Sequence, residues 1–232
     1  MATMTARQVD AMWAAIDEQR VRTADLLDGL EPDQWEQASL CEGWTVRDVG
    51  AHLTMQQQRW RDALAFVARH PRLVRSRGLN GFIHDATVTR AGELTTAQIV
   101  ERIRSGIGSR RHNPVVTPLE TATDILVHGQ DIAVPLGIGL PMHTSLSALA
   151  ATRRWDTRQT WLATVNTRLP LEDHRLTATD TDWVRGSGPE VAGPIGALLL
   201  VLTGRAAALG QLTGPGVDAL HRAVTPTTTQ GI

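Results

Sequence analysis

The strongest constraint on the fold is the spacing of the apolar residues, which changes once along the chain. Up to about residue 165 they recur every three or four positions, the period of an amphipathic helix. This pattern predicts helices over residues 9–30, 45–68, 96–111, 118–134 and 145–165. Four of these can close into a bundle with small crossing angles. Residues 70–92 contain Pro71 and several glycines, and we expect a long connection there.

After Pro170 the pattern becomes shorter and more varied. Residues 174–179 and 182–185 have the composition of short strands, and the apolar run 195–202 is expected to be a helix that Pro194 starts. A last short helix is expected after residues 214–216. We therefore predict a mainly α fold with a small α+β part at the C-terminal end. The expected domains are a helical bundle over 1–167, an α+β domain over 168–226 and a polar tail over 227–232.

Composition excludes several classes of protein. The single cysteine, Cys41, excludes a disulfide scaffold and a four-cysteine zinc finger. All 23 basic residues are arginine, so a Schiff-base enzyme and a P-loop NTPase, which need lysine, are excluded. With 24 acidic residues the net charge is −1, which argues against a nucleic-acid partner.

The chain also shows no sequence feature of a membrane protein or a secreted protein. Its longest apolar run, Ile195 to Leu202, is too short to span a bilayer. The first ten residues lack the cationic and apolar segments of a signal peptide. We expect a cytoplasmic protein with no membrane partner.

A candidate metal site is predicted from two of the expected helices. Asp124 and His128 are four residues apart, which puts both side chains on one face of a helix. Two such groups can converge on a zinc ion, and His52 on the helix that begins at Thr45 is the best third ligand. The same spacing also fits an exposed helical pair. The apolar neighbours of His128 and His52 favour burial, where an imidazole needs a partner.

Other residues near these positions have two interpretations each. Asp131, three residues after His128, is expected either to orient that histidine or to be an ordinary surface acid. Cys41 has no histidine fixed nearby by sequence, and we expect it to pack as a small hydrophobe. Trp44 is expected to anchor the entry to the second helix.

Three segments carry a resemblance to a known family. Residues 41–53, Cys-Glu-Gly-Trp-Thr-Val-Arg-Asp-Val-Gly-Ala-His-Leu, and residues 124–133, Asp-Ile-Leu-Val-His-Gly-Gln-Asp-Ile-Ala, resemble two segments of the mycothiol-dependent maleylpyruvate isomerase family. Residues 178–183, 188–194 and 202–205 are similar to its C-terminal domain. This family lies within the DinB-like superfamily of metal-binding four-helix bundles. The resemblance implies a DinB-like four-helix bundle followed by the small α+β domain.

The resemblance also implies a ligand set and a co-substrate. By it, His52, Asp124 and His128 bind a divalent metal, most often zinc, with the fourth position open to water or to the thiol mycothiol. The family's carboxylate ligand is often Glu, so Asp124 is one methylene shorter, and Glu120 is a less favoured substitute. The family uses an arginine of the C-terminal domain to hold an anion. Arg205 is the candidate catalytic residue for this, with Arg222 as the alternative and a simple helix-end cation as the competing interpretation of Arg205.

These residues together predict a function. We expect a divalent-metal enzyme, with zinc as the most expected ion, that activates mycothiol for isomerisation of a small electrophilic substrate or for transfer of the thiol to it. The alternative is a non-catalytic metal-binding or regulatory module that binds a ligand. The expected partners are therefore a small-molecule substrate and a low-molecular-weight thiol. The resemblance leaves a homodimer open.

Overall fold

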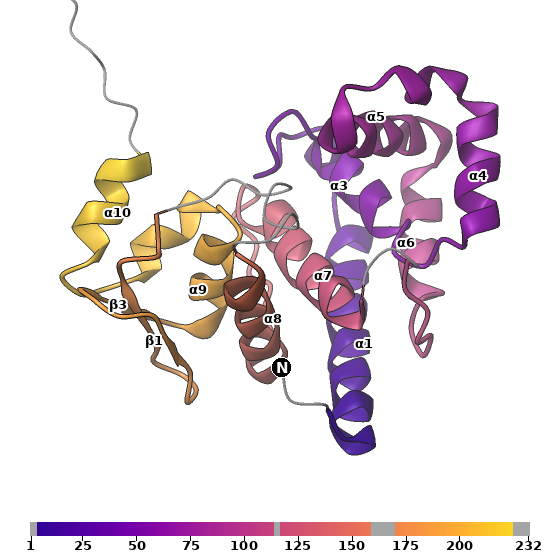
Figure 1. Ribbon diagram of the computed structural model, residues 1–232. Helices are drawn as coiled ribbons and strands as arrows, with labels where there is room; N and C mark the ends of the chain where they lie inside the picture. Colours follow the sequence, from indigo (N-terminus) through magenta and orange to yellow (C-terminus); the bar gives the residue numbers. More distant parts are fainter. Residues whose placement is uncertain (1–3, 114–116, 159–169, 225–232) are drawn as a thin grey trace, which may run out of the picture. The chain divides into compact units, whose positions relative to one another are not determined.

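The computed structural model describes residues 4–113, 117–158 and 170–224, and it divides into two compact units, residues 1–146 and 147–232. The predicted boundary at residue 167 and the predicted polar tail over 227–232 lie outside the described residues. Among the described residues, no helix is both long enough and apolar enough to cross a bilayer. Figure 1 shows the helices and strands with their labels.

The first unit is a helical bundle. Its elements are α1 (Ala6–Asp28), α2 (Pro32–Trp35), α3 (Val46–Leu53), α4 (Trp60–Arg69), η1 (Pro71–Arg75), α5 (Gly78–Glu93), α6 (Thr96–Arg104), α7 (Pro118–Ala133) and the start of α8 (Thr144–Thr157). Helix α1 packs against α6 and α7, and α3 packs against α5, α6 and α7 (Figure 1). Ile16, Ile99 and Ile125 are completely buried between these helices, as the predicted apolar faces require. The fold class is the predicted one.

The structure corrects the expected second helix. Residues 45–68 do not form one helix, because α3 ends at Leu53 and α4 begins at Trp60. The Thr54 hydroxyl donates to the Ala51 carbonyl at 2.7 Å, and the Asp62 carboxylate accepts from the Arg59 N–H at 3.3 Å. Side-chain hydrogen bonds of this kind satisfy backbone groups at helix ends. The apolar spacing continues across the break, and for that reason the sequence pattern hides it.

The expected connection over residues 70–92 is also wrong, since most of it is helix α5. Three glycines, Gly78, Gly81 and Gly92, lie in this helix. Because glycine is a poor helix former, the sequence does not indicate a helix here. Its buried side chains are small or polar, which gives a weak apolar stripe: Ala86, Thr87, Arg90 and Ala91. The predicted helix 96–111 is shorter, ending at Arg104 before Gly106 and Gly108. The predicted helix over 118–134 matches α7 closely.

The second unit contains a small sheet. Strands β1 (Arg175–Ala178), β2 (Val184–Arg185) and β3 (Glu190–Gly193) lie in the order β2-β1-β3, with β1 antiparallel to β2 and parallel to β3. Helix α9 (Ile195–Leu202) packs on β1 and β3, followed by η3 (Ala206–Gln211) and α10 (Val217–Val224). The two expected strands and the expected helix 195–202 are confirmed, whereas β3 was not predicted. The end of the predicted helix 145–165 lies outside the described residues.

Candidate metal centre

Helix α3 carries His52 into the bundle. The Thr45 hydroxyl accepts from the Asp48 N–H at 3.2 Å, and the Asp48 carboxylate accepts from the Thr45 N–H at 2.9 Å. These two reciprocal bonds form a capping box at the start of the helix, which the sequence predicts to begin at Thr45. Val49 is completely buried, and the His52 side chain is only 18% exposed. The cap sets the start of the helix, and its buried face sets where His52 lies.

Helix α7 carries the other two predicted ligands. Thr117 caps its first turn, Pro118 starts it, and Ile125 and Leu126 are completely buried. The Asp124 side chain is one-third exposed, and that of His128 is 13% exposed. The carboxylate therefore lies at the more open side of the group and His128 lies deeper.

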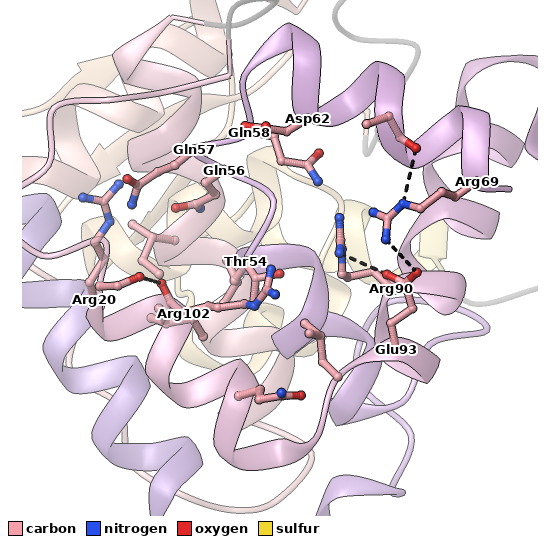
Figure 2. A pocket seen from close by; sticks show the side chains of 17 residues that line it. Arg20, Thr54, Gln56, Gln57, Gln58, Asp62, Arg69, Arg90, Glu93 and Arg102 are labelled. Carbon is pink, nitrogen blue, oxygen red and sulfur yellow. Dashed lines mark hydrogen bonds and ion pairs between the residues drawn. The ribbon is translucent and has the colours of Figure 1, made fainter.

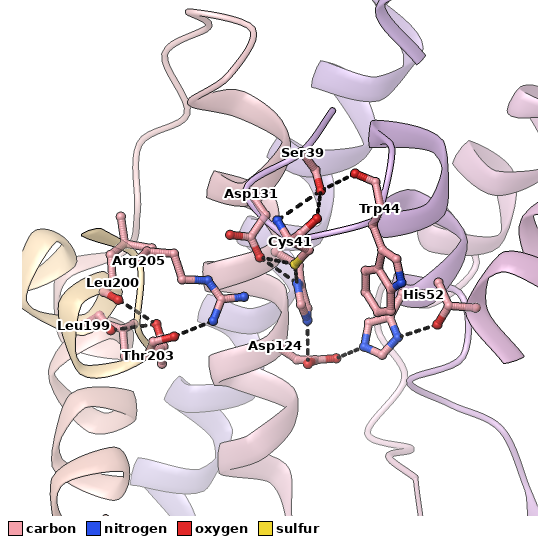
Figure 3. Close-up of polar contacts among 12 residues, drawn as sticks. Ser39, Cys41, Trp44, His52, Asp124, Asp131, Leu199, Leu200, Thr203 and Arg205 are labelled. Carbon is pink, nitrogen blue, oxygen red and sulfur yellow. Dashed lines mark hydrogen bonds and ion pairs between the residues drawn. The ribbon is translucent and has the colours of Figure 1, made fainter. Parts of the chain in front are cut away.

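The three side chains converge, and Figure 3 shows two of them, Asp124 and His52, side by side. His52 Nε2 lies 3.6 Å from Asp124 Oδ2, and His128 Nε2 lies 3.4 Å from Asp124 Oδ1. Ligand atoms of a tetrahedral zinc ion at its usual bond lengths are about 3.3 Å apart. These distances, the donor types and the mutual approach of one atom from each side chain within 4.8 Å all fit a divalent metal. Asp124 reaches both imidazoles despite being shorter than Glu.

The other ring nitrogen of each imidazole, Nδ1, also has a polar contact. His128 Nδ1 lies 2.8 Å from Asp131 Oδ2, and His52 Nδ1 lies 3.3 Å from Thr87 Oγ1. Because a carboxylate accepts a hydrogen bond, Nδ1 of His128 donates to Asp131, and Nε2 is the nitrogen that would bind a metal once its own proton is displaced. Asp131 is completely buried, so it is not the surface acid of the alternative interpretation. It has the position of a group that orients His128.

Cys41 differs from the prediction that it packs with no histidine nearby. Its Sγ lies 3.1 Å from Asp131 Oδ2 and 3.7 Å from His128 Nδ1. The neighbouring Leu40 N–H donates to the Asp131 carbonyl at 3.0 Å. Together with the contact of Cys41 with Asp131, which Figure 3 shows, this bond joins the loop before α3 to α7. Cys41, His128 and Asp131 form a second group of converging donor atoms. The sequence could not reveal it, because 87 positions separate Cys41 from His128.

Trp44 covers the two histidines. It is 9% exposed, and its ring centroid lies 5.2 Å from that of His52 and 6.2 Å from that of His128. The ring therefore excludes water from one side of both imidazoles, in addition to the anchoring role expected from the sequence.

The charges of this group favour the ionised carboxylate and the protonated imidazole. Burial raises the pKa of Asp124, but the charges and hydrogen bonds of His52 and His128 outweigh it, and that pKa lies well below its usual range. Burial lowers the pKa of His128, but Asp124, Asp131 and Cys41 together hold it well above its usual value. A divalent cation would take the place of the proton as the positive charge beside Asp124.

Glu120, the less favoured substitute ligand, has a different local role. Its carboxylate accepts from the Thr117 N–H at 2.9 Å and also bonds the Thr117 hydroxyl. It therefore completes the capping box of α7, two helical turns before His128.

The region that contains the candidate metal group matches the model of a known protein family. Residues 16–133 match the model of the mycothiol maleylpyruvate isomerase N-terminal domain. The chain belongs to this family. Membership confirms the family that the sequence resembles and places the chain among the enzymes of the mycothiol-dependent maleylpyruvate isomerase family.

The fold agrees with solved structures of that family. The chain is similar to a mycothiol-dependent maleylpyruvate isomerase, with a TM-score of 0.55, 11% sequence identity, and coverage of 89% of this chain and 92% of that one. A histidine-to-alanine mutant of such an isomerase gives the same TM-score and coverage at 10% identity. Among curated proteins, no sequence matches the chain significantly. At this identity the likeness concerns the fold.

The arginines predicted to hold an anion lie in the second unit. Arg205 follows α9, and its Nη1 donates to the Thr203 carbonyl at 2.6 Å, while its N–H donates to the Leu200 carbonyl at 2.8 Å. These bonds satisfy carbonyls at the end of α9, as the helix-end interpretation expects (Figure 3). Arg222 is exposed on α10. The role of either residue toward a substrate stays a prediction.

Proposed function

We propose that this member of the maleylpyruvate isomerase family is a divalent-metal enzyme that uses mycothiol to isomerise a small electrophilic substrate similar to maleylpyruvate, or to transfer the thiol to it. The observation that carries the proposal is the convergence of His52 Nε2, the Asp124 carboxylate and His128 Nε2 within the region that matches the family. Two imidazoles and one carboxylate are a common ligand set of catalytic zinc. Three protein ligands leave a fourth position for another molecule.

In the proposed centre, His52, Asp124 and His128 would hold the metal, and zinc suits their donor atoms best. When bound, such a cation lowers the pKa of a coordinated thiol and supplies a thiolate nucleophile at neutral pH. The chain then needs no nucleophile of its own.

The surrounding residues position the ligands. Asp131 accepts from His128 Nδ1 and so directs Nε2 toward the metal position, and Thr87 lies at His52 Nδ1. Gln56 donates to Asp124 Oδ2 at 3.1 Å, which orients the carboxylate. Trp44 keeps water from one face of the imidazoles. For the anionic substrate, Arg205 stays the proposed binding and catalytic residue, because a guanidinium can form two parallel hydrogen bonds to a carboxylate.

The proposal is tested by thiol-dependent turnover. Protein loaded with zinc is mixed with maleylpyruvate in the presence and the absence of mycothiol, and substrate and product are followed by chromatography. We expect turnover only with the thiol, at least about a hundredfold less in His128→Ala, and unchanged turnover in His112→Ala, a histidine outside the metal group. Turnover in His128→Ala equal to wild type would contradict the proposal. Binding of zinc without turnover of maleylpyruvate or conjugation of the thiol to it would favour the non-catalytic module.

A further inference from the structure

The most exposed large apolar side chains of the described residues belong to one short segment of the chain. Trp60 is 59% exposed, Leu64 68%, Val74 74% and Leu79 52%, whereas every other large apolar side chain in the described ranges is less than half exposed. They lie on α4, on η1 and at the start of α5, and η1 packs against both helices. Helix α4 lies at the outer side of the first unit (Figure 1). We call residues 59–79 the α4–η1 segment.

Helix α4 has an apolar face that the core does not use. Phe66 is buried and packs in a cluster with Leu73. Trp60 and Leu64 are one helical turn apart, so they share a face, and this face differs from that of Phe66. Packing within the unit therefore accounts for Phe66 but leaves Trp60 and Leu64 exposed. Apolar side chains that are exposed together mark a surface that contacts another molecule.

Arginines accompany these apolar side chains. The segment contains six, and all are exposed: Arg59, Arg61, Arg69, Arg72, Arg75 and Arg77. Arg61 lies 3.5 Å from Asp62, and Arg69 lies 3.9 Å from Glu93, which also binds Arg90 (Figure 2). The other four arginines of the segment form no ion pair with a described residue.

The positive charge remains when the neighbouring acids are counted. Residues 59–93, which comprise α4, η1 and α5, contain seven arginines against three acids, Asp62, Asp85 and Glu93, so their net charge is +4. The rest of the chain has 16 arginines and 21 acids, a net charge of −5. The segment is thus a local cationic region of a nearly neutral protein, and cations beside an exposed apolar helix face are typical of a membrane-surface helix.

A lipid surface fits this combination better than a second copy of the chain or a peptide. Tryptophan and leucine insert at the membrane interface, and guanidinium groups beside them bind lipid phosphates. In a symmetric dimer the same surface would meet itself, so arginines would face arginines. A groove for a peptide covers most of the surface of the side chains that line it, whereas Trp60, Leu64 and Val74 are each more than half exposed.

We propose that the α4–η1 segment binds the surface of a membrane that contains anionic lipids. Trp60 and Leu64 enter the boundary between headgroups and acyl chains, and the arginines pair with lipid phosphates. The sequence predicts no membrane partner from its short apolar runs, but a helix that lies on a membrane surface needs no spanning segment. This binding is independent of the proposed reaction, because no residue of the segment belongs to the candidate metal group.

Cosedimentation of the full-length protein with vesicles tests the proposal. One set of vesicles is phosphatidylcholine alone, and the other is an equimolar mixture of phosphatidylcholine and phosphatidylglycerol. Arg72→Gln and Arg75→Gln each remove one charge, and Leu64→Gln removes an apolar side chain. Arg7→Gln and Val21→Gln are the matched controls, because both side chains are exposed on α1, outside the segment.

We expect saturable binding to the mixed vesicles and at least about tenfold weaker binding to phosphatidylcholine alone. Arg72→Gln and Arg75→Gln should each weaken binding about fivefold, and Leu64→Gln by a similar factor. The two control variants should bind as wild type does. Circular dichroism checks the fold, and Trp60→Gln replaces Leu64→Gln if the latter does not fold.

Three results would overturn the proposal. The first is no binding to the mixed vesicles, or an equal loss of binding in the control variants. The second is binding that Arg72→Gln weakens but Leu64→Gln leaves unchanged, because a contact made by charge alone indicates an acidic protein or a nucleic acid as the partner. The third is a dimer in sedimentation velocity that Leu64→Gln dissociates, which would assign the segment to contact with a second copy.

Discussion

At the scale of single residues, Asp131 connects the parts of the candidate centre. Its carboxylate is completely buried and lies within hydrogen-bond distance of both the Cys41 thiol and His128 Nδ1. An ionised acceptor increases the basicity of the imidazole that donates to it, and so strengthens the lone pair at the other nitrogen. The Asp131 carboxylate therefore contacts both the loop before α3 and the candidate ligand His128 on α7.

Replacing this carboxylate should weaken metal binding. In Asp131→Asn the acceptor is neutral, so His128 becomes a poorer ligand, and we expect zinc affinity to fall about 10- to 100-fold. Competition with a chromophoric chelator measures this. Glu120→Gln is the matched control on the same helix, where the side chain caps Thr117, and its affinity should not change. Equal affinities in Asp131→Asn and wild type would show that Asp131 does not orient His128.

Metal affinity should also depend on pH. In the metal-free protein the pKa of His128 is well above its usual value, so this imidazole is protonated at neutral pH. A metal binds only neutral imidazole and must displace that proton. Zinc affinity should therefore rise as the pH rises through the raised pKa and level off above it. Calorimetry between about pH 6 and pH 9 in buffers of different ionisation enthalpy measures the released proton, and an affinity independent of pH would contradict this assignment.

Part of this centre could be predicted from the sequence. Asp124 and His128 are one helical turn apart, a local spacing that periodicity reveals, and His52 lies on a predicted buried face. The contact of Cys41 with Asp131 is not local, since 90 positions separate them and Cys41 lies in a loop. Helix periodicity carries no information on such contacts.

At the scale of elements, a strong cap and a buried stripe decide which predictions hold. Helices α3 and α7 begin at capping boxes with Thr45 and Thr117, and the sequence predicts helices that begin at Thr45 and at residue 118. Helix α5 has neither a capping side chain nor a continuous apolar stripe, and the sequence does not reveal it. It is stabilised by tertiary packing against α3, which places Thr87 beside His52.

The cap of α3 should contribute to stability without taking part in metal binding. Thr45→Ala removes the acceptor for the Asp48 N–H, and we expect the free energy of unfolding to fall by about 1 kcal/mol in urea titrations. Thr45→Ser keeps the hydroxyl and should be near wild type. Zinc affinity should be unchanged in both, because His52 lies at the other end of the helix. A loss as large in Thr45→Ser as in Thr45→Ala would show that the hydroxyl cap is not the cause.

At the scale of the whole molecule, the chain consists of a helical unit that contains the candidate metal group, and a second unit with the small sheet. The family match covers residues 16–133, within the helical unit. The function proposed for the protein therefore depends first on whether that unit binds a metal through His52, Asp124 and His128.

The most direct test of this metal centre is metal content, measured by elemental mass spectrometry. The samples are the zinc-incubated full-length protein and the variants His52→Ala and His128→Ala. We predict about one zinc ion per chain in the wild type, as expected for a site with three protein ligands. Both variants should lose the ion and keep the circular dichroism spectrum of a helical protein. Wild-type protein without metal, or a variant with the wild-type amount, would contradict the assignment of the metal centre.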